Sequence, residues 1–316
     1  MENYRHPKVC VAIPVYNAEM WISRAIQSVL GQNYPDLCLI VVDDGSIDNS
    51  ANEIELFAND LLFIKGENRG ACHARNLGLQ AAKESSADYI LFLDADDYLE
   101  GDIIAGSVNQ ALGANVDMVV SNMHLRYKDG SCEKRFLYKN QIQPEEFYKG
   151  WMSGSYVNPS GILWRVDFIE RIGGWDESLA RAQDLEITLR ALQNRPCIWK
   201  NETGAAIHAR VNPASISNNQ SEQALQSRFR AVSGLVDSAQ GTTFSEYDGL
   251  MYREIYHIAS AAFRYGHIAL GRRIVGYLKE KKYRKHPGTR LHAVVAGIIG
   301  LENKTRLRKC IGRERH

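Results

Sequence analysis

Long apolar runs are missing from this chain of 316 residues. No run of about 18 apolar residues occurs, so we expect no membrane-spanning helix. Residues 1–7 also lack the apolar stretch of a secretory signal. The six cysteines show no Cys-x-x-Cys spacing, and Cys10 and Cys38 lie inside apolar runs. This usage argues against a disulfide framework and predicts a reduced, cytoplasmic protein.

Excess charge of one sign is also missing from the chain as a whole, because its formal net charge is +1 at pH 7. Residues 279–316 nevertheless contain twelve Lys or Arg against three Glu. No nucleic-acid recognition motif accompanies this basic segment, so we expect no nucleic acid partner. Two interpretations stay open: contact with an anionic membrane surface, or packing on the rest of the chain or on a second subunit of a homodimer.

The first half of the chain alternates strand and helix signals. Apolar runs predict strands at residues 9–13, 37–42, 61–65 and 89–93, with helices at 18–29, 48–58 and 71–83 between them. This alternation predicts an α/β fold with a doubly wound sheet. Ligands of such sheets bind outside the carboxyl ends of the strands.

The second half is more mixed and then becomes helical. The patterns predict a hairpin of strands at 116–127 and 132–137, a helix at 144–149, a strand at 161–165, helices at 167–172 and 184–194, and a short strand at 205–209. After residue 218 the pattern is helical. We therefore predict an α/β domain over residues 1–217 and a helical, basic appendage over residues 218–316.

Polar segments follow each of the first four predicted strands. They are Pro14-Val15-Tyr16, Asp43-Asp44-Gly45, Glu67-Asn68-Arg69 and Asp94-Ala95-Asp96. Because parallel strands end at the same edge of a sheet, we expect all four segments to lie along one edge.

The strand predicted at residues 89–93 ends in three acids, Asp94, Asp96 and Asp97. Carboxylates are costly to remove from water and repel one another when close. A hard divalent cation removes both problems, since Mg²⁺ or Mn²⁺ takes oxygen ligands and leaves positions open for phosphate oxygens. The segment therefore predicts a metal site, with a solvated acidic loop as the alternative.

Six short sequence segments carry a resemblance to a known family, and they occur in the same order as in that family. They are Ala12-Ile13-Pro14-Val15-Tyr16-Asn17, Val41-Val42-Asp43-Asp44-Gly45-Ser46, Glu67-Asn68-Arg69-Gly70 with Ala74-Arg75-Asn76, Phe92-Leu93-Asp94-Ala95-Asp96-Asp97, Ile172-Gly173-Gly174-Trp175-Asp176-Glu177 and Gln183-Asp184-Leu185-Glu186. Over residues 7–217 the chain resembles the family 2 glycosyltransferases. The resemblance implies the GT-A fold, a Rossmann-like mixed sheet, and sugar transfer with inversion from a nucleotide-diphosphate donor.

The resemblance also implies how the acids act. Asp96 corresponds to the family residue that binds Mn²⁺ or Mg²⁺, and Asp94 to the one that reaches ribose or metal. His208 is a candidate for a further metal ligand, with a hydrogen-bonded strand residue as the alternative. Asp97 is an extra acid whose role stays open; its structural interpretation is that it caps a helix from residue 98 onward.

The donor pocket is expected at the first strand ends. Pro14 and Tyr16 offer an apolar surface to the base, and Asp44 accepts hydrogen bonds from base or ribose. Arg69 and Arg75 are candidates for contact with the base or the diphosphate, with an ion pair to a nearby Asp as the alternative for Arg75. The predicted donor-binding set is Pro14, Tyr16, Asn17, Asp44, Gly45, Ser46, Asn68, Arg69, Arg75, Asp94 and Ala95.

Inverting transfer also needs a base for the acceptor hydroxyl. The family has an acidic pair, or Gln followed by Asp, at the position where this chain has Gln183-Asp184. Asp184 is therefore the candidate base. Glu186 is the alternative base, and the structural alternative is that Asp184 only caps the helix. Trp151, between Gly and Ser residues, is predicted to lie in a loop that faces the acceptor.

The predicted function is transfer of a sugar, from a UDP-sugar by default, to a glycan or lipid-linked acceptor at the inner face of the membrane. Such a reaction belongs to the synthesis of cell-surface polysaccharide or glycolipid. A non-catalytic nucleotide-sugar-binding relative is the alternative. A sugar nucleotidyltransferase fits less well, because it usually carries a Gly-rich basic loop where this chain has Pro14-Val15-Tyr16.

Overall fold

The structure is a computed structural model that describes residues 6–112, 116–135, 138–210, 219–283 and 300–303. It contains two compact units: residues 1–177 with 187–213, and residues 178–186 with 214–316. Each unit is described by itself. The predicted boundary between residues 217 and 218 stays a prediction, since residue 217 lies outside the described ranges.

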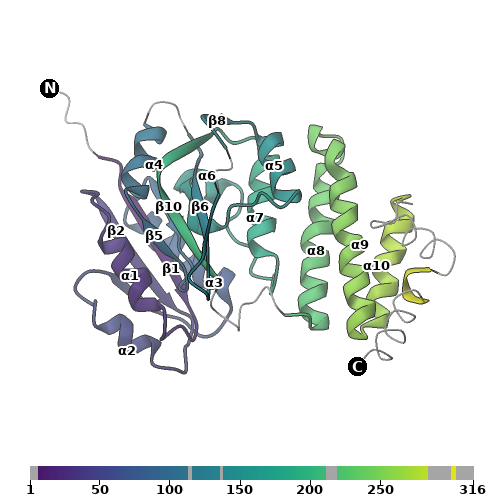
Figure 1. The fold of residues 1–316 in the computed structure, drawn as a ribbon, viewed down its shortest axis with the longest axis horizontal. Coiled ribbons are helices and arrows are strands. Elements are labelled where there is room, and N and C mark those ends of the chain that lie inside the picture. The colour runs from purple at the N-terminus through teal and green to yellow at the C-terminus, as the bar shows by residue number, and fades with distance from the viewer. Residues whose placement is uncertain (1–5, 113–115, 136–137, 211–218, 284–299, 304–316) are drawn as a thin grey trace. The chain divides into compact units, whose positions relative to one another are not determined.

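The first unit contains one mixed sheet (Figure 1). Its described strands are β1 (Val9–Val15), β2 (Leu37–Asp43), β3 (Leu62–Lys65), β4 (Tyr89–Phe92), β5 (Tyr98–Glu100), β6 (Met118–Tyr127), β7 (Cys132–Arg135), β8 (Gln141–Ile142), β9 (Ile162–Arg165) and β10 (Ile198–Arg210). The order along the sheet is β3-β2-β1-β4-β9-β6-β10-β5, with β7 on β6 and β8 on β10. The strands predicted in the first half are confirmed.

The four strands β1, β2, β3 and β4 run parallel to one another, through the pairs β1–β2, β1–β4 and β2–β3. Val15 lies opposite Asp43 in the β1–β2 pair, and Ala12 lies opposite Phe92 in the β1–β4 pair. Strand β9 is antiparallel to both β4 and β6. The residues that follow β1, β2 and β4 therefore reach the same edge, which we call the carboxyl edge.

Helices cover both faces of the sheet. The helices of this unit include α1 (Ile22–Leu30), α2 (Ser50–Glu55), α3 (Ala71–Glu84), α4 (Ile103–Ala111), α5 (Pro144–Met152) and α6 (Val166–Arg171). Alternate residues of β1, including Val9, Val11 and Ile13, pack in one apolar core with α1 and α4. Helix α3 packs on the other face, where Gly78 lies against Ala12.

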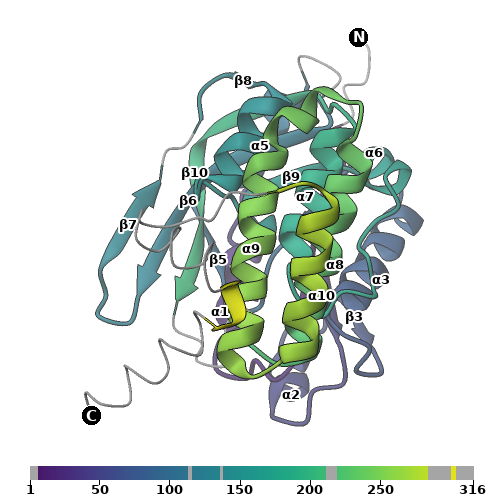
Figure 2. The ribbon, with the colours of Figure 1, turned by 90° about the vertical axis from the view of Figure 1, so that its right-hand side faces the viewer.

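The second unit contains helices α8 (Glu222–Ala239), α9 (Asp248–Tyr265) and α10 (Ile268–Glu280), which lie side by side in Figure 2. Helix α9 has an apolar face, on which Ile255, Ile258 and Phe263 are buried. Within the described ranges, no helix combines the length and apolar character needed to span a bilayer.

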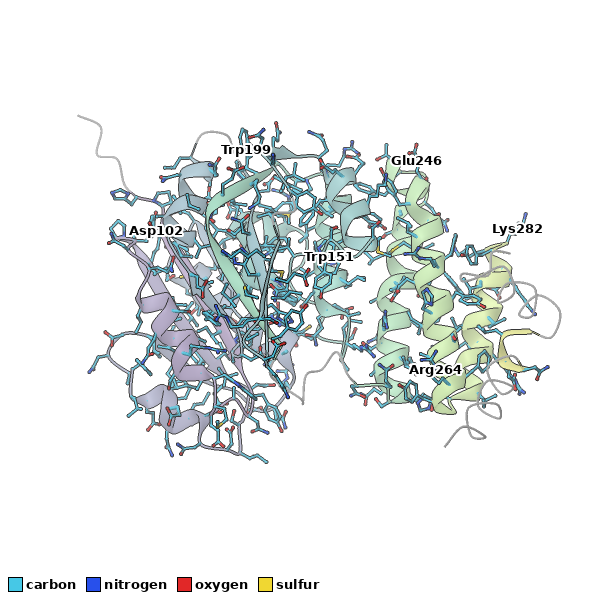
Figure 3. The ribbon with its side chains drawn as sticks, in the orientation of Figure 1. Asp102, Trp151, Trp199, Glu246, Arg264 and Lys282 are labelled. Atoms are coloured by element: carbon cyan, nitrogen blue, oxygen red, sulfur yellow. The ribbon has the colours of Figure 1, made fainter. Side chains whose placement is uncertain are left out.

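Two sequence predictions are wrong, and a third gave a strand that is too short. Residues 98–100 form strand β5, not a helix, because Tyr98 pairs with Ile207 of β10. The short strand predicted at 205–209 is the end of the longer β10, which begins at Ile198. Trp151 lies on helix α5, labelled in Figure 3, and not in a loop; its ring packs 5.5 Å from that of Tyr156.

The close approach of α3 to β1 gives a stability test. A Cβ atom at position 78 would lie 2.7 Å from Ala12 Cβ, which is buried. We expect Gly78→Ala to lower the free energy of unfolding by about 1–3 kcal/mol, since overpacking forces the backbone apart.

The matched control is Gly276→Ala in α10, where an added Cβ meets nothing within 4 Å among the described residues. That variant should gain up to about 1 kcal/mol of helix propensity. Urea unfolding curves measure the free energy of unfolding of both variants. Equal stability of the two variants would show that α3 and β1 do not pack this closely in solution.

Candidate active site

The loops after β1 and β2 are tied together by backbone hydrogen bonds. The N–H of Asn17 donates to Ser46 Oγ (2.9 Å), and the N–H of Ile47 donates to Asn17 Oδ1 (2.9 Å). Asp43 Oδ1 accepts the N–H of Ser46 (2.9 Å), so this acid orients the turn. Gly45 has φ 78°, a left-handed conformation that favours glycine.

Asp44 connects these loops to the start of α3. Its side chain is 3% exposed; Oδ1 accepts the N–H of Arg69 (2.9 Å) and Oδ2 accepts the N–H of Gly70 (2.6 Å). Both carboxylate oxygens therefore hold backbone N–H groups. Its predicted contact with base or ribose stays a prediction, and it would add to this structural role.

The apolar surface predicted for the base lies beside this connection. Tyr16 is 47% exposed, and its hydroxyl is 3.5 Å from Asn68 Nδ2. Asn68 itself has φ 55°, and Pro14 lies within β1. The Tyr16 ring is thus available at the carboxyl edge.

Arg75 joins α3 to the acidic turn after β4. Its side chain is 6% exposed, one guanidinium nitrogen lies 2.7 Å from Asp94 Oδ1, and the group lies 4.5 Å from the centre of the Trp175 ring. The Trp175 ring meets Phe92 edge-on, with the ring centres 5.3 Å apart. The structure therefore contains the ion pair that was the alternative for Arg75, and contact of Arg75 with the nucleotide-sugar donor stays a prediction.

The segment around Trp175 is held against α3 by a second set of contacts. Asn76 Oδ1 accepts the N–H of Trp175, and Asn76 Nδ2 donates to Trp175 O and to Glu177 Oε1, each at 2.9 Å. Glu177 also lies 3.0 Å from His73 Nδ1 and 3.4 Å from Arg69. The hydrogen bond from Asn76, then the neighbouring His73 and Arg69, lower the pKa of Glu177.

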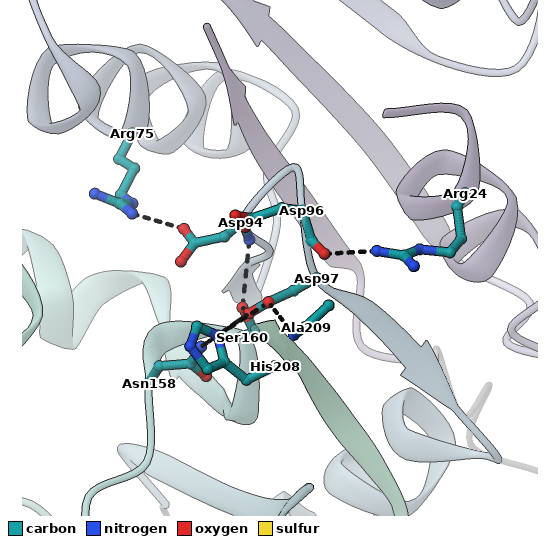
Figure 4. Close-up of polar contacts among 9 residues, drawn as sticks. All are labelled: Arg24, Arg75, Asp94, Asp96, Asp97, Asn158, Ser160, His208 and Ala209. Atoms are coloured by element: carbon teal, nitrogen blue, oxygen red, sulfur yellow. Dashed lines mark hydrogen bonds and ion pairs between the residues drawn. The ribbon is translucent and has the colours of Figure 1, made fainter. Parts of the chain in front are cut away.

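Asp96 occupies the tip of the acidic turn (Figure 4). Its backbone carbonyl accepts a hydrogen bond from Arg24 of α1 (2.7 Å), and the same guanidinium lies 4.5 Å from the centre of the Tyr98 ring. These contacts hold the backbone of the turn and bring a positive charge beside it.

Asp97 turns inward and is fully buried. Its Oδ2 accepts from Asn158 Nδ2 and from Ser160 Oγ, each at 2.8 Å, and its Oδ1 accepts the N–H of Ala209 (3.1 Å). Oδ1 also lies 3.1 Å from His208 Nδ1 (Figure 4). The prediction that Asp97 caps a helix is wrong, because α4 begins at Ile103 and these partners lie elsewhere in the sheet.

His208 is a strand residue of β10 with a half-buried side chain. Its Nδ1 lies between Asp97 and Asn158 Nδ2, the latter at 3.3 Å. Burial opposes the charged imidazole, but the hydrogen bond and charge of Asp97, with Asp94 and Asp96 adding, raise the pKa of His208 to about 9. The hydrogen-bonded alternative for this residue is confirmed, and a metal-ligand role stays a prediction.

The acidic side chains of the site suit a hard divalent cation that also binds a ligand. Asp94 and Asp96 offer carboxylate oxygens, which Mg²⁺ and Mn²⁺ prefer. In the part of the chain that the structure describes, no group of three or more His, Cys, Asp or Glu side chains is arranged to hold a metal ion alone. The two acids therefore fit a metal whose remaining ligands are phosphate oxygens and water.

The candidate base lies on helix α7 (Gln183–Gln193). Gln183 is the first helical residue, so Asp184 and Glu186 both lie in the first turn. Residues 178–186 belong to the second unit and residues 187–213 to the first. The assignment of Asp184 as base, and of Glu186 as its alternative, stays a prediction.

Several residues of the site were not assigned a role from the sequence. Arg24, Asn158 and Ser160 hold the acidic turn through contacts across 61 to 72 residues of chain. Asn76 and Glu177 belong to recognised segments, and their spacing in family order was the one available signal for them. Nothing in the local sequence distinguishes Asn158 from an ordinary loop residue.

Comparison with solved structures identifies the fold. S. aureus TarS residues 1–349, in complex with UDP-GlcNAc, match with a TM-score of 0.62 over 95% of this chain and 92% of that chain, at 16% identity. The mannosyltransferase PcManGT of Pyrobaculum calidifontis, in complex with GDP-Man and Mn²⁺, matches with a TM-score of 0.58 over 96% and 83%, at 16% identity. The fold is the GT-A fold of glycosyltransferases.

Sequence comparison gives the family. Residues 10–162 match the model of glycosyl transferase family 2. An uncharacterized glycosyltransferase of Haemophilus influenzae is 37% identical over 154 residues, which are 45% of this chain and 59% of the relative. Residues 10–162 of this chain therefore form a family 2 glycosyltransferase region, and the chain spans about three fifths of the length of that relative.

The two backbone contacts of Asp44 predict the effect of an isosteric change. In Asp44→Asn the amide NH₂ faces one of the two N–H groups, which is left unpaired. We expect the free energy of unfolding to fall by about 1–3 kcal/mol. Asp60→Asn, at an exposed position of the same unit, should change it by no more than about 0.5 kcal/mol. Thermal unfolding of both variants tests this, and an equal effect would contradict the structural role.

Proposed function

We propose that this protein is an inverting glycosyltransferase that moves a sugar from a nucleotide-diphosphate donor to a hydroxyl group. One observation carries the proposal: the loop junction held by Asp44 and the acidic turn of Asp94 and Asp96 share the carboxyl edge of the sheet. Ligands of doubly wound sheets bind at this edge. The relatives crystallised with UDP-GlcNAc and with GDP-Man and Mn²⁺ support a donor of this class.

In this proposal the loops after β1 and β2 bind the nucleoside. The exposed ring of Tyr16, with Pro14, meets the base, and the turn at Gly45 and Ser46 allows the backbone to approach it. Asn17, Asn68 and Arg69 border the same junction. Asp44 fixes the junction and contacts base or ribose.

The acidic turn binds the diphosphate end of the donor. Asp96 holds a divalent cation, Asp94 reaches ribose or the same cation, and Ala95 brings the backbone between them close to the donor. The bound Mn²⁺ or Mg²⁺ supplies Lewis-acid stabilisation of the charge that develops on the leaving diphosphate. Arg75 holds Asp94 in place through its ion pair and adds positive charge nearby.

Inversion requires the acceptor oxygen to attack the anomeric carbon from the side opposite the diphosphate. Asp184 takes the proton of that hydroxyl as the new bond forms and the bond from carbon to diphosphate oxygen breaks. The acceptor we propose is a glycan or lipid-linked sugar, used for cell-surface polysaccharide or glycolipid. UDP is the default nucleotide; the GDP-Man complex of PcManGT makes GDP the alternative to test.

The basic segment at residues 279–316 suits the inner face of an anionic membrane, where a lipid-linked acceptor would be found. A cytoplasmic protein bound peripherally to that surface, or a homodimer formed through the same region, are the two arrangements we propose for it. Most of this segment lies outside the described residues.

A nucleotide screen tests the donor class. UDP, GDP and their sugars, each with and without Mn²⁺, are added to the protein and the melting temperature is measured. A ligand at 100 times its Kd stabilises the folded state by about 2.7 kcal/mol, so a cognate nucleotide gives a clear shift. We expect the Mn²⁺-dependent part of the shift to vanish in Asp96→Ala and to persist in Asp60→Asn. No shift with any nucleotide in any metal would falsify the proposal.

The base assignment has a separate kinetic test. We expect Asp184→Asn to bind donor nearly as well as wild type while transfer falls about 10²–10⁴-fold. Glu186→Gln, two residues along the same helix, should retain most of the activity. If Glu186→Gln is the inactive variant and Asp184→Asn the active one, Glu186 is the base instead.

A further inference from the structure

Asp97 is the most completely surrounded acid of the carboxyl edge. It is 0% exposed and has four polar neighbours: Asn158 and Ser160 on Oδ2, and the N–H of Ala209 and the ring of His208 on Oδ1. A buried carboxylate is tolerated when its oxygens are hydrogen-bonded in this way. Residues from separate segments of the chain therefore enclose the Asp97 carboxylate.

The geometry follows from strand pairing. Tyr98 of β5 lies opposite Ile207 of β10, which brings the preceding Asp97 beside the following His208. The 3₁₀ helix η1 (Pro159–Gly161) supplies Ser160, whose Oγ also accepts the N–H of Asp94 at 3.3 Å. Asp97 thus connects the acidic turn to β10 and to η1 in one cluster (Figure 4).

The contact with His208 differs from the others, because a histidine has a second ring nitrogen. Nδ1 faces the carboxylate at 3.1 Å, so it carries a proton and donates it to Asp97. Among the residues that the structure describes, His208 Nε2 has no hydrogen-bond partner, although the side chain is only 29% exposed. The ring is thereby held by one nitrogen and leaves the other for a ligand.

We propose that Asp97 is a positioning residue: its carboxylate holds His208 by Nδ1 so that Nε2 meets the divalent cation or the diphosphate bound to it. Binding of the cation to Nε2 would release the proton of that nitrogen to water, whereas contact with the diphosphate would keep it. The inference rests on the proposed function. Carboxylates that orient a metal-binding histidine through its second nitrogen are a general device of metal sites, where they fix the ring and increase its basicity. Asp97 then acts through His208, whereas Asp94 and Asp96 act on the ligand directly.

A purely structural role makes a different prediction. If Asp97 did no more than tie β5 to β10, its loss would lower stability without a specific effect on metal binding. A double-mutant cycle separates the two roles, because residues that act through one another are not additive.

The experiment uses the full chain and four proteins: wild type, Asp97→Asn, His208→Gln and the double variant. Calorimetric titration of Mn²⁺ in the presence of UDP, and separately of GDP, gives the metal affinity of each. We expect Asp97→Asn to weaken Mn²⁺ binding about 10–100-fold in the wild-type background. In the His208→Gln background we expect a further change of less than about threefold. An equal loss in both backgrounds, or no loss, overturns the inference.

Asp117→Asn is the matched control for destabilisation. Asp117 is also a buried acid of the first unit; its Oδ2 accepts the N–H of Cys197 (2.9 Å) and its Oδ1 pairs with Arg165. Its variant should melt at a lower temperature with Mn²⁺ affinity unchanged within about threefold. If it weakens Mn²⁺ binding as much as Asp97→Asn does, the effect of Asp97 is general destabilisation and the inference fails.

A second readout needs neither metal nor activity. Proton NMR of the metal-free protein should show a low-field Nδ1–H resonance, assigned by its absence in His208→Gln, that is lost in Asp97→Asn. Ser160→Ala removes one donor to Asp97 and keeps the His208 contact, so it should keep the resonance. If Asp97→Asn does not fold, His208→Gln alone carries the test, because an unchanged Mn²⁺ affinity in that variant overturns the inference. Absence of the resonance in wild type overturns the inference.

The two proposals fail in distinguishable ways. If wild type binds neither UDP nor GDP with Mn²⁺, the proposed function fails and the metal role of His208 fails with it, whatever the NMR result. If wild type binds the nucleotide and the cycle is additive, the role of Asp97 alone is refuted.

Discussion

The parallel pairing of β1 with β2 and β4 is the constraint on which the site depends. Register fixes Val15 beside Asp43 and Ala12 beside Phe92, so the segments that follow these strands must meet. A slip of one residue would turn each side chain to the opposite face and move the apolar residues of β1 out of the core. Burial of Val11 and Ile13 thus secures the position of polar residues that contribute nothing to the core.

The acids at this edge divide into two kinds by their hydrogen bonds. Asp43, Asp44 and Asp97 are nearly or fully buried, and backbone N–H groups satisfy oxygens of all three. Asp94 and Asp96 are less buried, and the positive charges near them are Arg75 and Arg24. Since acids packed together repel, hydrogen bonds from backbone N–H groups to the inner ones and arginine side chains beside the outer ones allow five carboxylates to share one edge. That division leaves the outer pair for a ligand of opposite charge.

Sequence patterns located the elements and the outer acids well, and the inner contacts poorly. The strands of the first half are short apolar runs between helical segments, and the structure has them within one or two residues. Strand β5 was mistaken for a helix because three residues, Tyr98–Glu100, carry too little pattern, and their partner on β10 lies over a hundred residues away. Polar residues at 201–203 concealed the first half of β10 in the same way.

The sequence by itself determined the class: the apolar runs, the acids that follow them and the order of the six segments define a GT-A domain of family 2. The tertiary structure decided what each acid does. Asp96 and Asp97 are adjacent and chemically identical, yet one lies at the tip of a turn and the other is enclosed by Asn158, Ser160 and His208. Hydrogen bonding across the sheet makes that difference, because a carboxylate takes its role from the donors around it, and those donors come from segments that meet only in the folded chain.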